Sequence, residues 1–157
     1  MKRTSVLIFL IASILFFNSC TKDNSLAEPV LTPAETLAST PWETTEAKNA
    51  TGQSVPLNDA NVSNFVGFAY FKSDSTFTMY NLDDSPKMKG NWWLSPDGTT
   101  RTIVARNDAG TVLFTRIVDI VALSAEVFTY RIYPDANDKT LYYDIIHTST
   151  SHPEPVK

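Results

Sequence analysis

The sequence predicts an all-β fold, an antiparallel meander of eight short strands closed into a barrel and preceded by one short helix. Two observations favour it. β-Branched and aromatic residues gather in short runs after residue 41, and turn residues separate each run from the next. Because every connection is short, a closed barrel is favoured over a sandwich of two sheets, which would need longer crossing connections and ranks second.

The first nineteen residues have the layout of a secretion signal peptide, residues 1–19. Lys2 and Arg3 form a basic start, an apolar run extends from Val6 to Phe17, and a short polar stretch follows. As a helix that run would rise only about 18 Å, whereas a bilayer core needs about 30 Å. We therefore expect the segment to be cleaved and not to remain as a transmembrane anchor.

Cys20 is the only cysteine of the chain, which excludes an intramolecular disulfide. The stretch Phe17-Asn18-Ser19-Cys20 resembles a bacterial lipobox of the relaxed kind found in Bacteroidetes, whose cysteine thiol receives diacylglycerol before cleavage. Phe17 is too bulky for the third position before an ordinary cleavage site. The resemblance implies lipidation at Cys20 and attachment to a membrane. The alternative is a leftover cysteine beside a conventional cut.

The segment that follows is polar and interrupted by proline, which predicts a flexible lipidated tether over residues 20–31. The domain itself is predicted to occupy residues 32–157. Its size is sufficient for one core of its own, and without disulfides that core must carry the stability.

A short helix is predicted at the start of the domain. Thr32 is placed to cap it, Pro33 suits the first helical position, and Glu35 can reach back to the N–H of the cap residue. Pro41 ends the helix after one or two turns, and Trp42 opens the first strand.

The other strands are predicted from runs of β-forming residues, and hairpin-like loops rich in Asp, Ser, Asn and Gly divide them. An eight-stranded barrel has room inside for its own side chains or for one small ligand, so both a filled and an open interior are consistent with the sequence. The predicted strands are residues 65–71, 76–82, 87–94, 99–106, 112–123, 126–133 and 141–148.

Composition argues against several functions. Loss of the signal peptide leaves 11 basic residues against 17 acidic ones, a net charge of −6 that disfavours nucleic acid as a partner. No serine nucleophile motif occurs, so we predict a protein that is not an enzyme. His147, His152 and Glu154 are the nearest approach to a metal cluster, yet two of them lie in a proline-rich tail that we expect to be mobile. We therefore predict no metal site and no cofactor.

Charges within apolar strands are the most informative residues. Arg116 lies on one face of its strand and Asp119 on the other, while Arg131 and Asp144 lie in the next two strands. If such charges point inward, they must be paired, because an isolated buried charge is too costly to keep. A barrel interior pairing either arginine with either aspartate would suit a ligand with an apolar body and a polar or anionic end. The alternative is that these side chains point outward. With two tyrosines, the predicted ligand-binding residues are Arg116, Asp119, Arg131, Asp144, Tyr130 and Tyr143.

Aromatic residues raise a second question. Trp92 and Trp93 are adjacent, so one can fill the core while the other faces outward. The run around Phe68 and Tyr70 likewise places rings on both faces of its strand. Helix cover, a partner protein or a carbohydrate would each account for the outward rings, and an ordinary amphipathic surface patch is the default interpretation.

Several blocks of sequence carry a family resemblance. The capped helix, the tryptophan-bearing first strand and the meander resemble lipocalin-like domains of bacterial lipoproteins. From Leu37 to the C-terminus, the chain is most similar to a lipoprotein family of unknown function, which implies a fold but no catalytic residues. The lipocalin-like resemblance rests on Gly90-Asn-Trp92 and Phe71-Lys-Ser-Asp-Ser-Thr-Phe77. The resemblance to the family of unknown function rests on Asn64-Phe-Val-Gly-Phe-Ala-Tyr70, Asp97-Gly-Thr-Thr-Arg-Thr-Ile-Val104, Phe128-Thr-Tyr-Arg-Ile-Tyr-Pro134 and Asp144-Ile-Ile-His-Thr148.

Together these observations predict a lipid-anchored cell-envelope lipoprotein that binds a small amphipathic ligand without catalysis. The outer membrane is the expected location, and its periplasmic and surface faces both stay open. The alternative is an envelope protein that acts through its exposed aromatic residues in protein interaction or structure, with a partner that the sequence does not identify.

Overall fold

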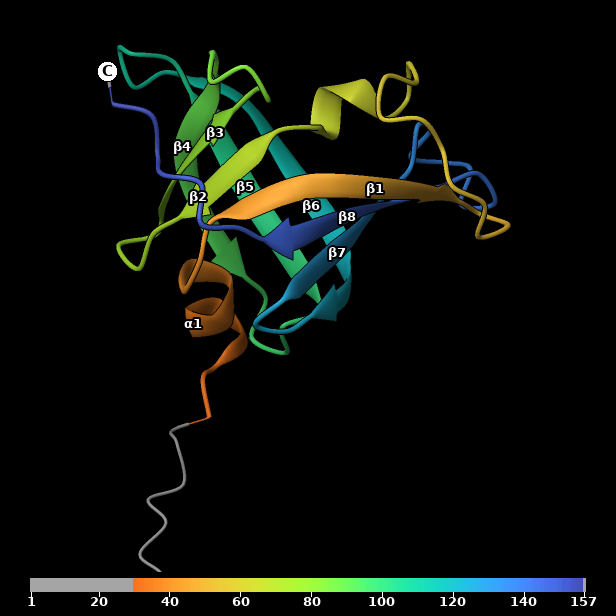
Figure 1. The fold of residues 1–157 in the computed structure, drawn as a ribbon, viewed down its shortest axis with the longest axis horizontal. Helices are drawn as coiled ribbons and strands as arrows, with labels where there is room; N and C mark the ends of the chain where they lie inside the picture. Colours follow the sequence, from red (N-terminus) through yellow and green to blue (C-terminus); the bar gives the residue numbers. More distant parts are fainter. Residues whose placement is uncertain (1–29, 157) are drawn as a thin grey trace, which may run out of the picture.

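The computed structural model describes residues 30–156, so the predicted signal peptide, Cys20 and most of the tether lie outside the described residues. Eight antiparallel strands pair in sequence order, and β8 returns to pair with β1, which closes the barrel (Figure 1). The predicted all-β closed meander is therefore confirmed. Among the described residues, no helix is both long and apolar enough to cross a membrane.

The strands agree with the predicted runs to within a few residues, apart from β2. They are β1 (Trp42–Asn49), β2 (Phe68–Phe71), β3 (Thr76–Tyr80), β4 (Pro86–Leu94), β5 (Thr100–Arg106), β6 (Val112–Leu123), β7 (Val127–Ile132) and β8 (Tyr143–Ser149).

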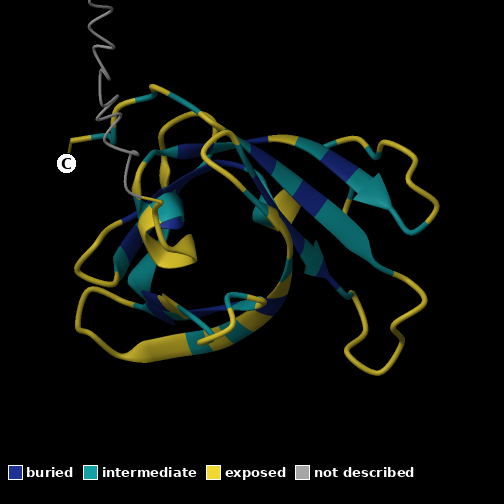
Figure 2. Ribbon diagram, turned by 90° about the horizontal axis from the view of Figure 1, so that it is seen from below, coloured by how far each residue is buried: buried dark blue, intermediate teal, exposed yellow. Residues whose placement is uncertain are grey.

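The helix α1 (Pro33–Ala38) begins with the predicted capping box. The backbone N–H of Glu35 donates to Thr32 Oγ1 over 3.3 Å, and the N–H of Thr32 donates to Glu35 Oε2 over 2.8 Å. α1 lies across one end of the barrel (Figure 2), where Leu37 is buried and its carbonyl accepts a 2.8 Å hydrogen bond from Trp42 Nε1. We call this the helix end.

The opposite end, which we call the loop end, carries the connections β1–β2, β3–β4, β5–β6 and β7–β8. The long β1–β2 connection contains a short 3₁₀ helix, η1 (Ser63–Phe65). The prediction that residues 65–67 belong to a strand is wrong. Phe65 ends η1, and Gly67, at φ 147°, lies so close to the Tyr80 carbonyl that a Cβ there would be 2.1 Å from its oxygen.

Aspartate builds several of the tight turns, as the loop composition predicts. In each case its carboxylate accepts from the residue two positions later, which fixes the turn locally. The pairs are Asp74 with Thr76, Asp83 with Ser85, Asp97 with Thr99 and Asp138 with Thr140.

Alternation along the strands sorts the side chains into an inner and an outer set. The inner set forms the main core, in which Phe128 contacts Trp42, Phe71 and Tyr130 with ring centroids 5.5–6.2 Å apart. Trp92 belongs to this core, while Trp93 is 49% exposed on the outer face, as the adjacent pair predicts.

The C-terminal segment after Ser149 packs against the outer face, so the expectation of a mobile tail is wrong. His152 stacks on Phe68 with centroids 3.9 Å apart, and the hydroxyl of Tyr70 lies 2.8 Å from His152 Nδ1. Lys72 and Glu154 add an ion pair of 3.0 Å. The outward rings of β2 and β3 are thus covered by the chain itself, in a second buried cluster of Phe68, Tyr70 and Tyr80.

Candidate functional site

A cavity of about 370 Å³ opens between β6 and β7 toward the loop end, and we call it the mouth cavity. The ladder between these strands ends at the pair Asp119 and Arg131, although β6 extends seven residues further toward its start. The strands diverge from that pair onward, so both inner and outer side chains reach the gap. The lining residues are Phe65, Arg116, Ile117, Val118, Asp119, Arg131, Ile132, Tyr133, Ala136 and Lys139.

Arg116 supplies the cavity's inward cation. It lies on the face of β6 that carries buried Val118, and its guanidinium stacks between two rings, 4.7 Å from the centroid of Phe65 and 5.0 Å from that of Phe114. Burial lowers the pKa of Arg116, with Tyr130 opposing the shift. Of the two positions that the sequence left open for Arg116, the structure has the inward one.

The other three charges lie on the outer face, which is the outward alternative that the sequence left open, and the paired arrangement inside the barrel does not form. Arg131 forms a bidentate ion pair with Asp144 across β7 and β8, with Nε–Oδ1 2.7 Å and Nη2–Oδ2 2.9 Å. The hydrogen bond to Asp144 raises the pKa of Arg131. Asp119 is opposite Arg131 on β6 and accepts a 3.2 Å hydrogen bond from the Tyr133 hydroxyl.

The physical reason is the strand alternation itself. Phe128, Tyr130 and Ile132 occupy the inner face of β7, which leaves the outer face for Arg131. A carboxylate on the neighbouring strand then meets it in a half-exposed position, where the pair keeps part of its hydration.

The two predicted tyrosines lie inside the barrel at different depths. Tyr130 is buried, and burial raises the pKa of its hydroxyl. Tyr143 is half-buried at the loop end, where its hydroxyl accepts a 3.3 Å hydrogen bond from Asn61 Nδ2. Ligand binding by these six residues stays a prediction.

The centre of the barrel is filled by side chains, so the ligand cannot occupy it as it stands. The cavity bounded by Arg101, Tyr130 and His147 measures only about 10 Å³, which is room for one water molecule. Arg101 is 2% exposed and its guanidinium lies 4.4 Å from the ring of Tyr130. Sequence reasoning did not single out Arg101, although the residue shares a strand face with Ile103 and Ala105.

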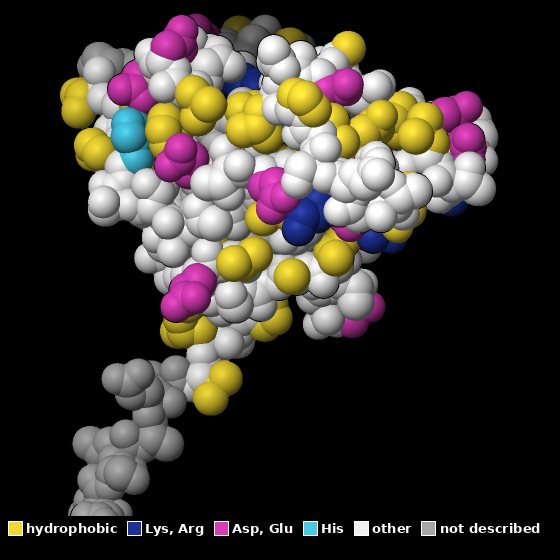
Figure 3. All heavy atoms as spheres, turned by 45° about the vertical axis from the view of Figure 1, so that its right-hand side comes forward, with side chains coloured by type: hydrophobic (Ala, Val, Ile, Leu, Met, Phe, Trp, Pro, Cys, Tyr) yellow, Lys and Arg dark blue, Asp and Glu magenta, His cyan; other side chains and the backbone are white. Residues whose placement is uncertain are grey.

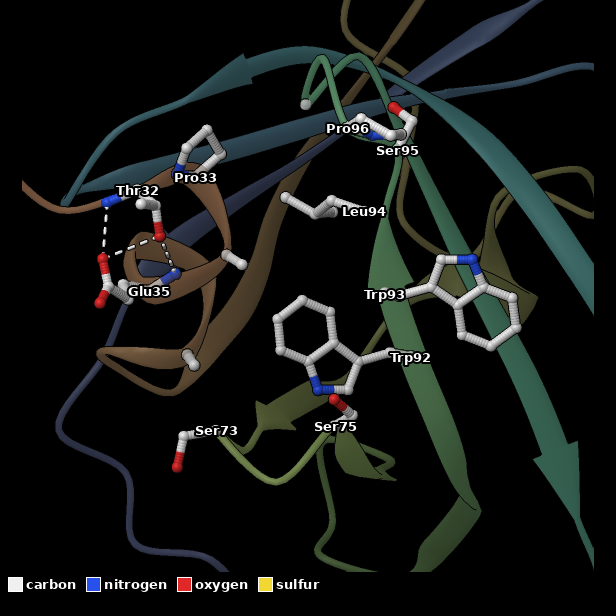
Figure 4. Close-up of a pocket in the computed structure, with 13 residues that line it drawn as sticks. Thr32, Pro33, Glu35, Ser73, Ser75, Trp92, Trp93, Leu94, Ser95 and Pro96 are labelled. Carbon is white, nitrogen blue, oxygen red and sulfur yellow. Dashed lines mark hydrogen bonds between the residues drawn. The ribbon is translucent and has the colours of Figure 1, made fainter.

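A second cavity, of about 460 Å³, lies at the helix end between α1 and the end of β4. Figure 4 shows Trp92 and Leu94 directed toward α1, while Trp93 projects to the other side of the strand. The carboxylate that lines it belongs to Glu35, whose Oε2 already accepts hydrogen bonds from Thr32. The other residues that line this cavity are uncharged, so it offers no unpaired charge to orient a ligand.

The histidines lie on different faces of the barrel wall. His147 is 3% exposed on the inner face, with Nε2 3.0 Å from Thr44 Oγ1, whereas His152 lies on the outer face. Both have packing or hydrogen-bond partners among the described residues. No group of three or more potential metal ligands converges within residues 30–156.

Side chains on the surface are mixed in type. Figure 3 shows one face on which apolar and acidic side chains are interspersed with fewer basic ones. This distribution agrees with the acidic composition and offers no extended basic stripe on that face for nucleic acid.

The closed meander with a short helix across one end defines a lipocalin-like barrel, and a solved structure shares it. A lipocalin-like protein from Bacteroides uniformis aligns with a TM-score of 0.50 at 16% identity, over 73% of this chain and 99% of that one. Residues 34–156 match the family described as a domain of unknown function, DUF4822, and the chain belongs to that family. Both the lipocalin-like resemblance and the family of unknown function predicted from the sequence are thereby confirmed.

Other comparisons are more distant. The amine-binding protein of Rhodnius prolixus, solved with tryptamine, aligns at 14% identity with a TM-score of 0.42, over 75% of this chain and 64% of that one. A biogenic amine-binding protein aligns with the same TM-score, over 65% of its length. No curated protein matches the chain significantly.

Proposed function

We propose that this protein is a lipid-anchored module of the bacterial cell envelope that binds a small amphipathic ligand in the mouth cavity without catalysing its conversion. The observation that carries the proposal is the composition of that cavity. About 370 Å³ of space combines apolar walls with the guanidinium of Arg116 and the charges of Asp119 and Arg131 at its rim.

The mouth cavity suits this role better than either alternative space. The barrel centre holds about 10 Å³, too little for an organic ligand. The helix-end cavity is larger, but its carboxylate is occupied by the capping box. In the mouth cavity, by contrast, the guanidinium of Arg116 lies over two rings and has no ion pair among the described residues.

The proposal predicts that Ala136→Trp weakens ligand binding. Ala136 is exposed in the β7–β8 connection and lines the mouth cavity, so an indole there would occupy the space without disturbing the core. We expect the dissociation constant of anilinonaphthalene sulfonate, an amphipathic fluorescent probe, to rise at least about tenfold. A fluorescence titration measures it.

The matched control is Ala109→Trp, which places the same indole on an exposed turn that does not line the cavity. It should bind the probe as the wild type does. Equal binding by all three proteins would contradict the mouth cavity as the site, and no saturable binding by the wild type would contradict the proposed function. Native mass spectrometry of protein purified without added ligand would identify the natural occupant.

Lipid attachment at Cys20 is supported by the lipobox resemblance and by the absence of any other cysteine in the sequence. We expect the mature N-terminus to be Cys20 carrying more than one acyl chain, because a single chain anchors only marginally. Mass spectrometry of the N-terminal peptide tests this. An unmodified cysteine, or a terminus elsewhere, would contradict the anchor and the envelope location, while fractionation with surface proteolysis would separate the two membrane faces.

A second candidate function is protein interaction through exposed aromatic and aliphatic side chains. Trp93 and Ile117, 49% and 65% exposed, flank Thr102 on the outer face of three adjacent strands. This role predicts that affinity capture from the solubilised envelope recovers a stoichiometric partner with the wild type and loses it with Trp93→Ala. Equal recovery with both proteins would argue against this surface.

A further inference from the structure

The interior of the barrel at the loop end contains three cations and, among the described residues, no carboxylate to balance them. Arg101 is the deepest, Arg116 lies next to it, and Lys87 reaches in from a bulge in β4. The neighbouring ring hydroxyl and imidazole belong to Tyr130 and His147. Burial raises the pKa of Tyr130 and lowers that of His147, so both are neutral near neutral pH.

Arg101 is the least compensated of these groups. Its guanidinium is 2% exposed and is surrounded by the rings of Phe71, Phe128 and Tyr130, with centroids 4.4–5.3 Å from Cζ. Its Nε and Nη1 find no hydrogen-bond acceptor among the described residues. Ring faces attract a guanidinium but do not accept its in-plane N–H groups as a carboxylate would.

The ion pairs of the described chain lie elsewhere. The five of them involve Lys48, Lys72, Lys89, Arg131 and His152, each with a carboxylate on the outer face or in a loop. Lys87 is held instead by the Val66 carbonyl, to which Nζ donates over 2.6 Å. The mutual repulsion of the inner cations is therefore not offset by any charge that the described residues supply.

We infer that this interior is a binding site for a compact anion, held between the guanidinium groups of Arg101 and Arg116 with Lys87 at its rim. The cavity that these three residues line has room for one water-sized particle, which fits a halide or the oxygen of a small carboxylate. Arg101 has unused N–H donors, one of which can donate a directed hydrogen bond to such an anion. This inference goes beyond the proposed function, because a compact anion needs only the inner groups and not the mouth cavity.

An anion could arrive alone or as the end of an amphipathic ligand. Arg116 and Phe65 each line both the inner cavity and the mouth cavity. A carboxylate on a short apolar chain could therefore place its charge inside and its chain in the mouth. In both cases an anionic group occupies the inner cavity, and the experiment distinguishes a free anion from the anionic end of an amphipathic ligand.

The test is thermal unfolding of the purified protein near neutral pH at constant ionic strength. Sodium gluconate, whose anion is too large for the cavity, is replaced stepwise by sodium chloride or sodium formate. We expect a saturable rise in Tm of about 5 °C, because an anion that binds only the folded state stabilises it. Equal Tm values in gluconate, chloride and formate would overturn the site.

Variants assign the effect to the residues. Arg101→Met removes the buried charge at similar volume, so we expect its Tm in gluconate to exceed that of the wild type and its anion response to vanish. Arg116→Gln should raise the apparent dissociation constant about tenfold. Arg106→Met is the matched control, since Arg106 is on the same strand but bonds to Asn91 and the Gly110 carbonyl outside the interior. It should keep the response. An undiminished response in Arg101→Met would overturn the assignment.

Two further measurements keep the site testable if a variant folds poorly. Broadening of the chloride NMR signal by the wild-type protein, reversed by formate, would show the anion directly, and no broadening would count against the site.

Decanoate is then compared with decylammonium. If decanoate stabilises the protein at a lower concentration than formate does, the ligand of the site is an amphipathic anion. If both stabilise it at the same concentration, the ligand is the compact anion itself. Stabilisation by decylammonium alone would overturn the inference, whereas failure of the anilinonaphthalene probe to bind would affect only the mouth cavity.

Discussion

Gly90→Ala is expected to lower the free energy of unfolding by about 3 kcal/mol or more, although it adds a single methyl group. A Cβ at Gly90 would lie 1.9 Å from the carbonyl oxygen of Val104 on the neighbouring strand. The obstacle is backbone, so it cannot rotate away as a side chain would. Strands β4 and β5 would have to separate at the point where Gly90 is paired with Ala105.

The measurement is urea-induced unfolding, followed by the fluorescence of the tryptophans. Gly110→Ala is the matched control, because Gly110 is at φ 80° in a turn and no atom lies within 4 Å of the position of its Cβ. We expect Gly110→Ala to lower the free energy of unfolding by only about 1 kcal/mol, through backbone strain. Similar losses of unfolding free energy in the two variants would show that conformational strain, and not the close approach of β4 to β5, explains why glycine is needed at position 90.

The second large effect is a loss of stability in acid that depends on His147. Burial of the ring, with the charge of Arg101 as the next cause, lowers the pKa of His147 from 6.5 to about 3. Between these two values the unfolded chain binds a proton that the folded protein does not. Stability from this group is therefore fully present above pH 6.5 and declines as the pH falls toward 3.

At about pH 4 the expected loss from this residue is about 3 kcal/mol relative to neutral pH. His147→Gln removes the titration and retains a polar group that can reach Thr44, so its unfolding free energy should fall less steeply with pH. Urea unfolding of both proteins at several pH values between about 7 and 4 measures the difference, because titrations common to both cancel. Parallel curves for the two proteins would contradict a buried neutral imidazole.

His147 and Arg101 also bear on the ligand. The neutral imidazole and the unpaired guanidinium belong to the same inner group, so occupation of the inner site by an anion would reduce the repulsion that Arg101 exerts on a protonated His147. An anionic occupant should then lessen the acid sensitivity of the wild type but not that of His147→Gln. Acid stability and anion binding are thus linked through one cluster of side chains.

Local structure could be predicted because its causes are local. The capping box needs only Thr32 and Glu35 at their spacing, and it forms as expected. The strands follow from short runs of β-forming residues between turn signals, and the turns follow from aspartates that bond within their own loops. The order of pairing from β2 to β8 follows as well, since the short connections between these strands favour sequence neighbours as partners.

The prediction of a strand at residues 65–67 failed because residue type and backbone conformation disagree there. Phe65 and Val66 favour a strand by residue type, but Phe65 ends η1 and Gly67 has a positive φ of 147°, so β2 begins only at Phe68. The close approach of Gly67 to the carbonyl group of Tyr80 is a tertiary contact, so it could not be predicted from the sequence alone. Phe65 thereby lies at the loop end and not in the barrel wall, and the guanidinium of Arg116 lies over its ring.

The sequence by itself determined the meander, its helix and the division of each strand into two faces, because the spacing of residue types and the turn residues are sufficient for these features. It also determined that Cys20 has no cysteine partner within the chain. Which face turns inward was decided only by closure of the barrel. Alternation relates Arg131 to Tyr130 but cannot say which of them is enclosed, and the fit of aromatic rings at the centre settles it.

The same closure decided the two features that carry the functional inferences. It placed Arg101 among rings with two nitrogens unsatisfied, and it set Arg116 between the inner cavity and the mouth. It also brought the C-terminal segment back over Phe68 and Tyr70, which the sequence left exposed. Burial and charge balance depend on residues far apart in the chain, so only the tertiary structure could reveal an uncompensated cation in the interior.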